Sequence, residues 1–187
     1  QGEDGAEASF AGQYDSVLNV SGHDELLRAI DQCVDSLASE RADSYAGREG
    51  SDEAPVMNVV VQRMVNARAA GVVFTADPVS ARRDLLVVDA VEGLGEALVS
   101  GEATPDHYAI DADGSVLRRE LAGASAILDD KVLQRIAREA RQAQNSEGQP
   151  LGLEWAVDQS GEVFWLQARP VTPLPADLTG FDTPLSR

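Results

Sequence analysis

The stretch LGLEWAVDQSGEVFWLQARP, residues 151–170, most constrains how this chain can fold. Two runs of apolar, aromatic and β-branched residues flank Ser160-Gly161, a pair typical of a two-residue β-hairpin turn. Alternate residues of a strand lie on opposite faces, and this hairpin predicts one fully apolar face. Its predicted pairs are Leu153 with Ala168, Trp155 with Leu166, and Val157 with Phe164. A slip of one residue would scramble this face, so the pattern supports the register.

The opposite face of the same hairpin carries polar groups. Its predicted pairs are Gly152 with Arg169, Glu154 with Gln167, and Ala156 with Trp165. Directly paired residues lie about 5 Å apart, which brings a carboxylate, a carboxamide oxygen and a guanidinium together. Two hard oxygen ligands suit Mg²⁺, and an arginine suits a phosphate. A surface ion pair between Glu154 and Arg169, with Gln167 uninvolved, fits the pattern equally well. The pattern alone leaves both interpretations open.

The remainder of the chain predicts an α+β fold with a mainly antiparallel sheet and two long helices. Apolar residues at helical spacing predict helices over about 21–45 and from 129 to about 145. Strands are expected over 56–65, 71–75, 85–89, 108–110, 115–118, 151–158 and 162–168, with a short helix or turn over 93–101. We expect residues 1–8 to be a disordered lead-in, 9–172 to form the folded part, and the proline-rich 173–187 to be a linker.

The charge balance excludes several classes of function. The chain has 32 Asp and Glu against 15 Lys and Arg, a net charge of −17, and Lys131 is its one lysine. This balance opposes sequence-independent binding to nucleic acids and polybasic attachment to membranes. The lone Cys33 excludes an intramolecular disulfide and a cysteine-based zinc site. No apolar run approaches the roughly 20 residues of a membrane span. The N-terminus lacks the features of a signal peptide, so we expect a cytoplasmic protein.

Other polar features allow more than one interpretation. The loop SFAGQYDSVLN, residues 9–19, could present backbone N–H groups to phosphate, although an ordinary polar loop fits as well. Gly93-Leu94-Gly95 is not a dinucleotide-binding motif, because Leu98 stands where the third glycine belongs. His23 and His107 have no metal or nucleophile partner by spacing, so they are interpreted as structural or solvated.

Four stretches together resemble one family: SFAGQYDSVLN (9–19), VVVQRMVNARAAGVVFTADPVSARR (59–83), GLGEALVSGEATPDHY (93–108) and LEWAVDQSGEVFWLQARPVT (153–172). They are similar to the nucleotide-binding domain of phosphoenolpyruvate synthases, pyruvate phosphate dikinases and rifampin phosphotransferases. That domain has an ATP-grasp fold, so the resemblance implies that this chain is an ATP-grasp C-terminal lobe. The segments FTADPV and GLGEALVSG look most like rifampin phosphotransferase, with phosphoenolpyruvate synthase next.

The resemblance also assigns roles to matching positions and implies ATP and Mg²⁺ as cofactors. Glu154 and Gln167 match the magnesium ligands, and Arg169 matches an arginine that contacts phosphate in catalysis. Gly12 and Ser16 fall in the loop that covers the ATP phosphates, and Gln62 falls where the family contacts the nucleotide. The hairpin register reached three of these residues independently, which favours the metal-site interpretation over the ion pair.

The implied parent is a multidomain phosphotransferase that moves phosphate from ATP to a carrier histidine and then to a small-molecule acceptor. In the family, a preceding lobe carries a phosphate-binding lysine and an arginine, and a separate swivelling domain carries the histidine. This chain matches neither, so we expect the isolated chain to be inactive. Its connection between Arg118 and Asp130 is also shorter than is usual in the family. The alternative is a non-catalytic docking module within a larger protein. The acceptor, pyruvate or an antibiotic hydroxyl or another, stays open.

Overall fold

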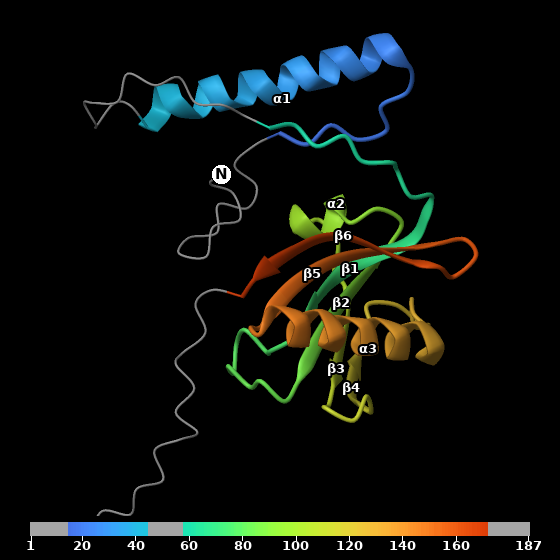
Figure 1. Cartoon of the computed structure of the whole chain (residues 1–187). Coiled ribbons are helices and arrows are strands. Elements are labelled where there is room, and N and C mark those ends of the chain that lie inside the picture. The colour runs from blue at the N-terminus through green and yellow to red at the C-terminus, as the bar shows by residue number, and fades with distance from the viewer. Residues whose placement is uncertain (1–14, 45–57, 172–187) are drawn as a thin grey trace, which may run out of the picture. The chain divides into compact units, whose positions relative to one another are not determined.

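The computed structural model describes residues 15–44 and 58–171 and divides the chain into two compact units, residues 1–64 and 65–187 (Figure 1). Each unit is described by itself. The predicted lead-in and linker, and the predicted loop glycine Gly12, lie outside the described residues.

The first unit contains the long helix α1 (His23–Ser44), as the apolar spacing predicts. Asp24 and Glu25 occupy its first turn, where the helix dipole favours negative charge. The predicted strand over 56–65 is wrong for its described part, because residues 58–65 belong to no helix or strand. A strand needs a hydrogen-bonded neighbour, and no described residue pairs with this segment. Val60 is consequently 82% exposed.

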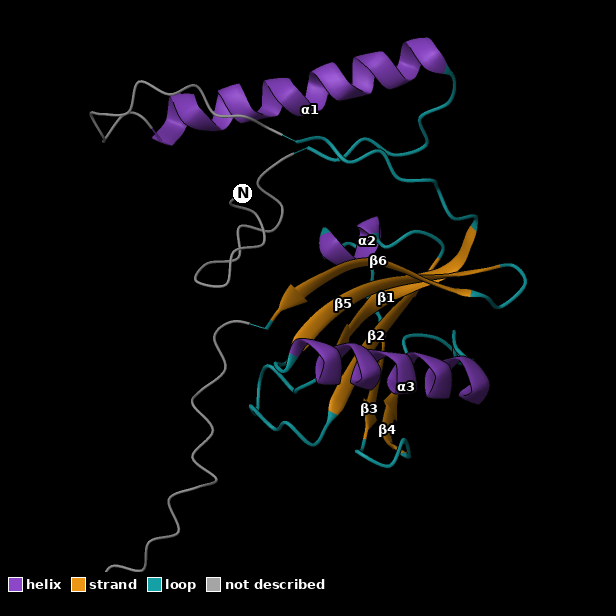
Figure 2. Cartoon of the chain, viewed as in Figure 1, coloured by secondary structure: helices purple, strands orange, loops and turns teal. Residues whose placement is uncertain are grey.

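The second unit is a six-stranded antiparallel sheet in the order β4-β3-β2-β1-β5-β6 (Figure 2). Its strands are β1 (Ala67–Phe74), β2 (Leu86–Glu92), β3 (Asp106–Ile110), β4 (Val116–Glu120), β5 (Leu151–Asp158) and β6 (Val163–Pro170). Each corresponds to a strand expected from the sequence. The sheet, with helices α1 and α3 (Asp130–Glu147), confirms the α+β class.

Helix α3 covers one face of the sheet, which we call the core face. Asp129 caps its start by accepting a hydrogen bond from the Val132 amide at 2.9 Å, and Gly148 ends it with a φ of 69°. Its buried side chains are the ones that helical spacing predicts: Val132, Leu133, Ile136, Ala137 and Ala140. They pack against strand residues that include the fully buried Tyr108 and Trp155. This core fixes which face each strand residue occupies.

Gly71 and Trp155 are direct cross-strand partners on the core face. A Cβ atom at position 71 would lie 1.9 Å from the Asp89 carbonyl oxygen and 2.7 Å from Cζ2 of the Trp155 indole. Only a glycine therefore lets the indole pack against the backbone here. The pair locks β1 and β5 in register.

The buried carboxylate of Asp106 ties the 121–127 connection to the sheet. It accepts hydrogen bonds from the Tyr108 hydroxyl and from the Ala122 and Ile127 amides, each 2.8 Å long. Burial opposes ionisation of Asp106, but the three donors outweigh it and lower its pKa. Burial, followed by the Asp106 carboxylate, raises the pKa of Tyr108 to about 12.

Candidate functional site

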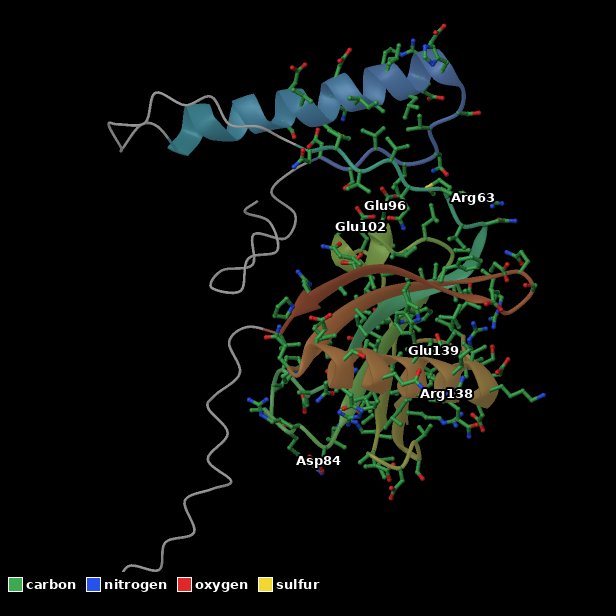
Figure 3. The ribbon with its side chains drawn as sticks, in the orientation of Figure 1. Arg63, Asp84, Glu96, Glu102, Arg138 and Glu139 are labelled. Atoms are coloured by element: carbon green, nitrogen blue, oxygen red, sulfur yellow. The ribbon has the colours of Figure 1, made fainter. Side chains whose placement is uncertain are left out.

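The face of the sheet opposite α3, which we call the open face, is only partly covered. Helix α2 (Glu96–Val99) and its flanking connection lie on this side (Figure 1). A Cβ atom at Gly95 would contact Ala70 of β1 at 3.7 Å, and Ala70 is buried. Figure 3 shows Glu96 and Glu102 on this side of the sheet, with Arg138 and Glu139 on α3 beyond the other side. In the strand rows beyond Ala70, some residues are buried, such as Val87, and others are half-buried, such as Val72 and Glu154.

Two of those rows contain the polar pairs predicted from the hairpin. The observed register pairs Glu154 with Gln167 and Gly152 with Arg169. Cross-strand partners share a face, so the side chains of Glu154, Gln167 and Arg169 all project from the open face of two neighbouring strands. Each of the three is half-buried. The predicted placement of these residues is confirmed, while their chemical roles are not established by it.

Nearer the turn, the predicted register is wrong by one residue. The structure pairs Trp155 with Trp165, Ala156 with Phe164, and Val157 with Val163. Leu166 is the extra residue of a β-bulge. The pairs Trp155 with Leu166, Val157 with Phe164 and Ala156 with Trp165 do not form.

The physical reason for the shift is the turn. Asp158 accepts hydrogen bonds from the Ser160 and Glu162 amides, and Gly161 takes a φ of 87°. Those features make a three-residue loop with a left-handed glycine in place of the two-residue turn. Trp165 consequently lies on the core side, where its indole donates to Glu139 at 2.9 Å. Phe164 lies on the open face and is 39% exposed.

The Glu154 row continues across the sheet to a histidine that sequence reasoning left without a partner. Glu154 pairs with Val72, Val72 with Asp89, and Asp89 with His107. His107 Nδ1 lies 2.7 Å from the Asp89 carboxylate, and its Nε2 lies 3.3 Å from Arg118 Nη2. A guanidinium only donates, so Nε2 accepts and Nδ1 donates to Asp89. Strand alternation alone could not reveal this contact, because it depends on which residue of β3 lies opposite Asp89.

A model of the pyruvate phosphate dikinase AMP/ATP-binding domain family matches residues 1–127 of this chain. That match covers more than half of the 187 residues. The chain belongs to this family.

Several relatives of this AMP/ATP-binding domain align over most of the chain. A rifampicin phosphotransferase from Streptomyces is 41% identical over 92% of the chain, and the prodigiosin synthesizing transferase PigC of Serratia marcescens is 39% identical over 91%. A probable phosphoenolpyruvate synthase of Methanocaldococcus jannaschii is 34% identical over 92%. The chain spans 22%, 22% and 16% of these proteins respectively. It therefore corresponds to one portion of much longer relatives.

The donor set on the open face has the chemistry that suits a magnesium ion shared with phosphate. Glu154 and Gln167 offer a carboxylate and a carboxamide oxygen side by side. Among the described residues, no group of three or more histidines, cysteines and acidic residues could hold a metal by itself. A metal at this pair would take its other ligands from water and phosphate, which is the coordination that Mg²⁺ favours.

The other predicted nucleotide contacts, Gly12, Ser16 and Gln62, belong to the first unit. Ser16 and Gln62 are exposed residues of that unit, and Gly12 is outside the described residues. Their roles stay predictions. In the described part of the chain, none of the helices has the length and apolar character to cross a membrane.

Proposed function

We propose that this chain is the magnesium- and ATP-binding lobe of a longer phosphotransferase. The observation that carries the proposal is the register of β5 and β6, which gathers Glu154, Gln167 and Arg169 on the open face of a member of an AMP/ATP-binding family. Phosphoryl transfer needs positioned phosphates and compensation of their charge. A carboxylate, a carboxamide and an arginine side by side meet both needs.

In this proposal Glu154 and Gln167 hold Mg²⁺, which supplies charge neutralisation at the phosphate oxygens when bound. Arg169, in the adjacent row, donates hydrogen bonds to a phosphate and stabilises the charge that develops during transfer. Gly12, Ser16 and Gln62 contribute the remaining contacts to the nucleotide. The core face holds Glu154 in place, because this residue alternates on β5 with the buried Leu153 and Trp155.

The proposed parent reaction uses partners outside this chain. A preceding lobe completes the nucleotide site, and a swivelling domain brings a carrier histidine that accepts phosphate from ATP. The phosphate then passes to a small-molecule acceptor, in keeping with relatives named for rifampicin and phosphoenolpyruvate. We place the protein in the cytoplasm, where ATP is available.

The test is the Glu154→Ala variant of the full-length protein. We expect turnover to fall by roughly 10²–10³, as for loss of a single electrostatic group in other enzymes. Stability should change by no more than about 0.5 kcal/mol, because Glu154 leaves no core cavity. Gln167→Ala should reduce turnover less, since a neutral carboxamide contributes less field at the metal.

Glu120→Ala is the matched control. Glu120 lies in the same cross-strand row, on the far edge strand β4, and should leave turnover unchanged. If Glu154→Ala keeps ATP-dependent phosphorylation intact and disrupts association between domains, the docking-module alternative is correct and the magnesium assignment is wrong.

A further inference from the structure

Phe74, Gly152 and Arg169 form one cross-strand row on the open face, directly beside the row of Glu154 and Gln167. Phe74 pairs with Gly152 across β1 and β5, and Gly152 pairs with Arg169 across β5 and β6. Phe74 and Arg169 are half-buried, whereas Gly152 is buried. The central residue of the row therefore has no side chain and is nevertheless covered.

The geometry around Gly152 shows what covers it. A Cβ atom at this position would lie 3.2 Å from Cε1 and 3.4 Å from Cδ1 of the Phe74 ring, and 3.8 Å from Cγ of Arg169. The ring and the aliphatic stem of the arginine thus lie against the same point on β5. Gly152 has no positive φ to explain a glycine there. The structural reason for a glycine here is that the Phe74 ring occupies the space that a side chain would need.

We propose that Phe74 is a positioning residue for Arg169, and that Gly152 admits the ring into that position. This inference rests on the proposed function of Arg169 as a phosphate-binding group. An arginine side chain has many rotamers, and a rigid ring beside its stem removes those that swing toward Phe74. Rotamers locked by packing hold a binding group ready for its ligand. Phe74 would thus raise nucleotide affinity without touching the nucleotide.

A double-mutant cycle on the full-length protein tests this coupling, with the dissociation constant for Mg·ATP measured by calorimetry. Arg169→Ala should weaken binding by about 10- to 100-fold, as expected for a charge-assisted hydrogen bond. Phe74→Leu should weaken it by about fivefold when Arg169 is present. In the Arg169→Ala background the same substitution should change affinity less than twofold. Phe74→Tyr keeps the ring and should bind as the parent protein does.

Gly152→Ala gives an independent arm of the experiment. Its methyl group would displace the Phe74 ring by a few tenths of an ångström, so affinity should fall by about two- to threefold, again only when Arg169 is present. Val73→Ala is the control, because Val73 is the fully buried core-face neighbour of Phe74. It should lower stability and leave the affinity of the folded protein unchanged. Thermal unfolding of each variant gives its melting temperature, and binding is measured at a temperature where all variants are folded.

The outcomes separate the two proposals. If Arg169→Ala leaves Mg·ATP affinity unchanged, the proposed function of this face is wrong. If Arg169→Ala weakens binding but Phe74→Leu has no effect, or has the same effect in both backgrounds, the proposed function stands and the positioning role of Phe74 is overturned.

Discussion

Each face of the sheet has a glycine that pairs with an aromatic residue across β1 and β5. The two pairs differ in how much space they leave for a side chain at the glycine. On the core face, a side chain at Gly71 would collide with the Asp89 backbone and with the fully buried Trp155 indole. On the open face, a side chain at Gly152 would only press on the edge of the half-buried Phe74 ring. The core-face pair fixes the strands, and the open-face pair has room for adjustment next to the proposed phosphate site.

The two faces also differ in how deeply their carboxylates are buried. The carboxylate on the core face, Asp106, is fully buried and surrounded by three donors. Glu154 and Asp89 on the open face are half-buried and lie in one row, with Val72 between them and with Gln167 and His107 as their outer neighbours. The same strands thus carry a buried core on one side and the proposed nucleotide site on the other. Substitutions on the two faces should separate stability from binding.

Gly71→Ala should produce the largest effect. Its Cβ would lie 1.9 Å from a backbone oxygen that cannot move without breaking the β1–β2 pairing. We expect a loss of about 4 kcal/mol or more in the free energy of unfolding, or failure to fold, which urea unfolding measures. Gly152→Ala, its counterpart on the open face, should cost about 1 kcal/mol. Equal losses at the two glycines would contradict the proposed difference between the faces.

Leu153→Ala should cause the next largest loss of stability. Leu153 is adjacent to Glu154 on β5, and its side chain lies on the opposite face of the sheet. Leu153 is 4% exposed within the core, so truncation should cost about 3 kcal/mol of stability. The folded full-length variant should still bind Mg·ATP with its original affinity, measured by calorimetry well below its melting temperature. Glu154→Ala should show the reverse pattern. A Leu153→Ala variant that is stable and binds nucleotide poorly would show that the faces are not independent.

The sequence predicted most of the second unit because local patterns agreed with tertiary packing there. The five buried residues of α3 have helical spacing, and Asp129 and Gly148 carry the cap chemistry that limits the helix. The prediction of a strand over 56–65 was wrong for its described part, because β-branched residues favour extended structure but cannot supply a neighbouring strand. The described part of that segment pairs with no described residue.

The candidate site was predictable up to the point where turn chemistry intervened. The pairs of Glu154 and Gly152 follow from apolar alternation at the far end of the hairpin. The bulge at Leu166 could not be predicted in this way. A third loop residue shifts the register by one position and the bulge shifts it back, so the far end of the hairpin pairs as it would with a two-residue turn. The Asp89–His107 contact joins residues 18 apart in the chain, so it becomes visible only once β2 and β3 are aligned.

The hydrogen-bonded pair of Asp106 and Tyr108 on the core face should make the free energy of unfolding depend on pH at both acidic and alkaline pH. The folded protein lowers the pKa of Asp106 below its ordinary 3.8, so its contribution is present above that pH and is lost as the pH falls below it. Tyr108 is raised from 10.0 to about 12, so its contribution is present below pH 10 and is lost between pH 10 and 12.

Asp106→Asn isolates the acidic limb of this dependence. The variant should lose about 2 kcal/mol or more at pH 7, because its amide has one accepting oxygen where the carboxylate uses two. The hydrogen bonds that remain go to a neutral acceptor, and the donor that faces the new NH2 group loses its partner. Its stability should then decline less steeply than that of the parent as the pH falls below 4. Urea midpoints collected across the pH range measure both effects, and parallel curves for the two proteins would rule out Asp106 as the titrating group.

Phe164→Ala should have the smallest effect, and it examines the hairpin register itself. In the predicted register Phe164 faced Val157 on the core side, where truncation would cost about 3–5 kcal/mol. In the structure it faces Ala156 on the open face and is 39% exposed, so we expect a loss of about 1 kcal/mol. Trp165→Ala, one residue along, should cost more, because its indole packs on the core and donates to Glu139. Urea unfolding of the two variants therefore tests the position of the bulge. A larger loss of stability for Phe164→Ala than for Trp165→Ala would support the two-residue turn and would place Phe164 on the core face, away from Glu154.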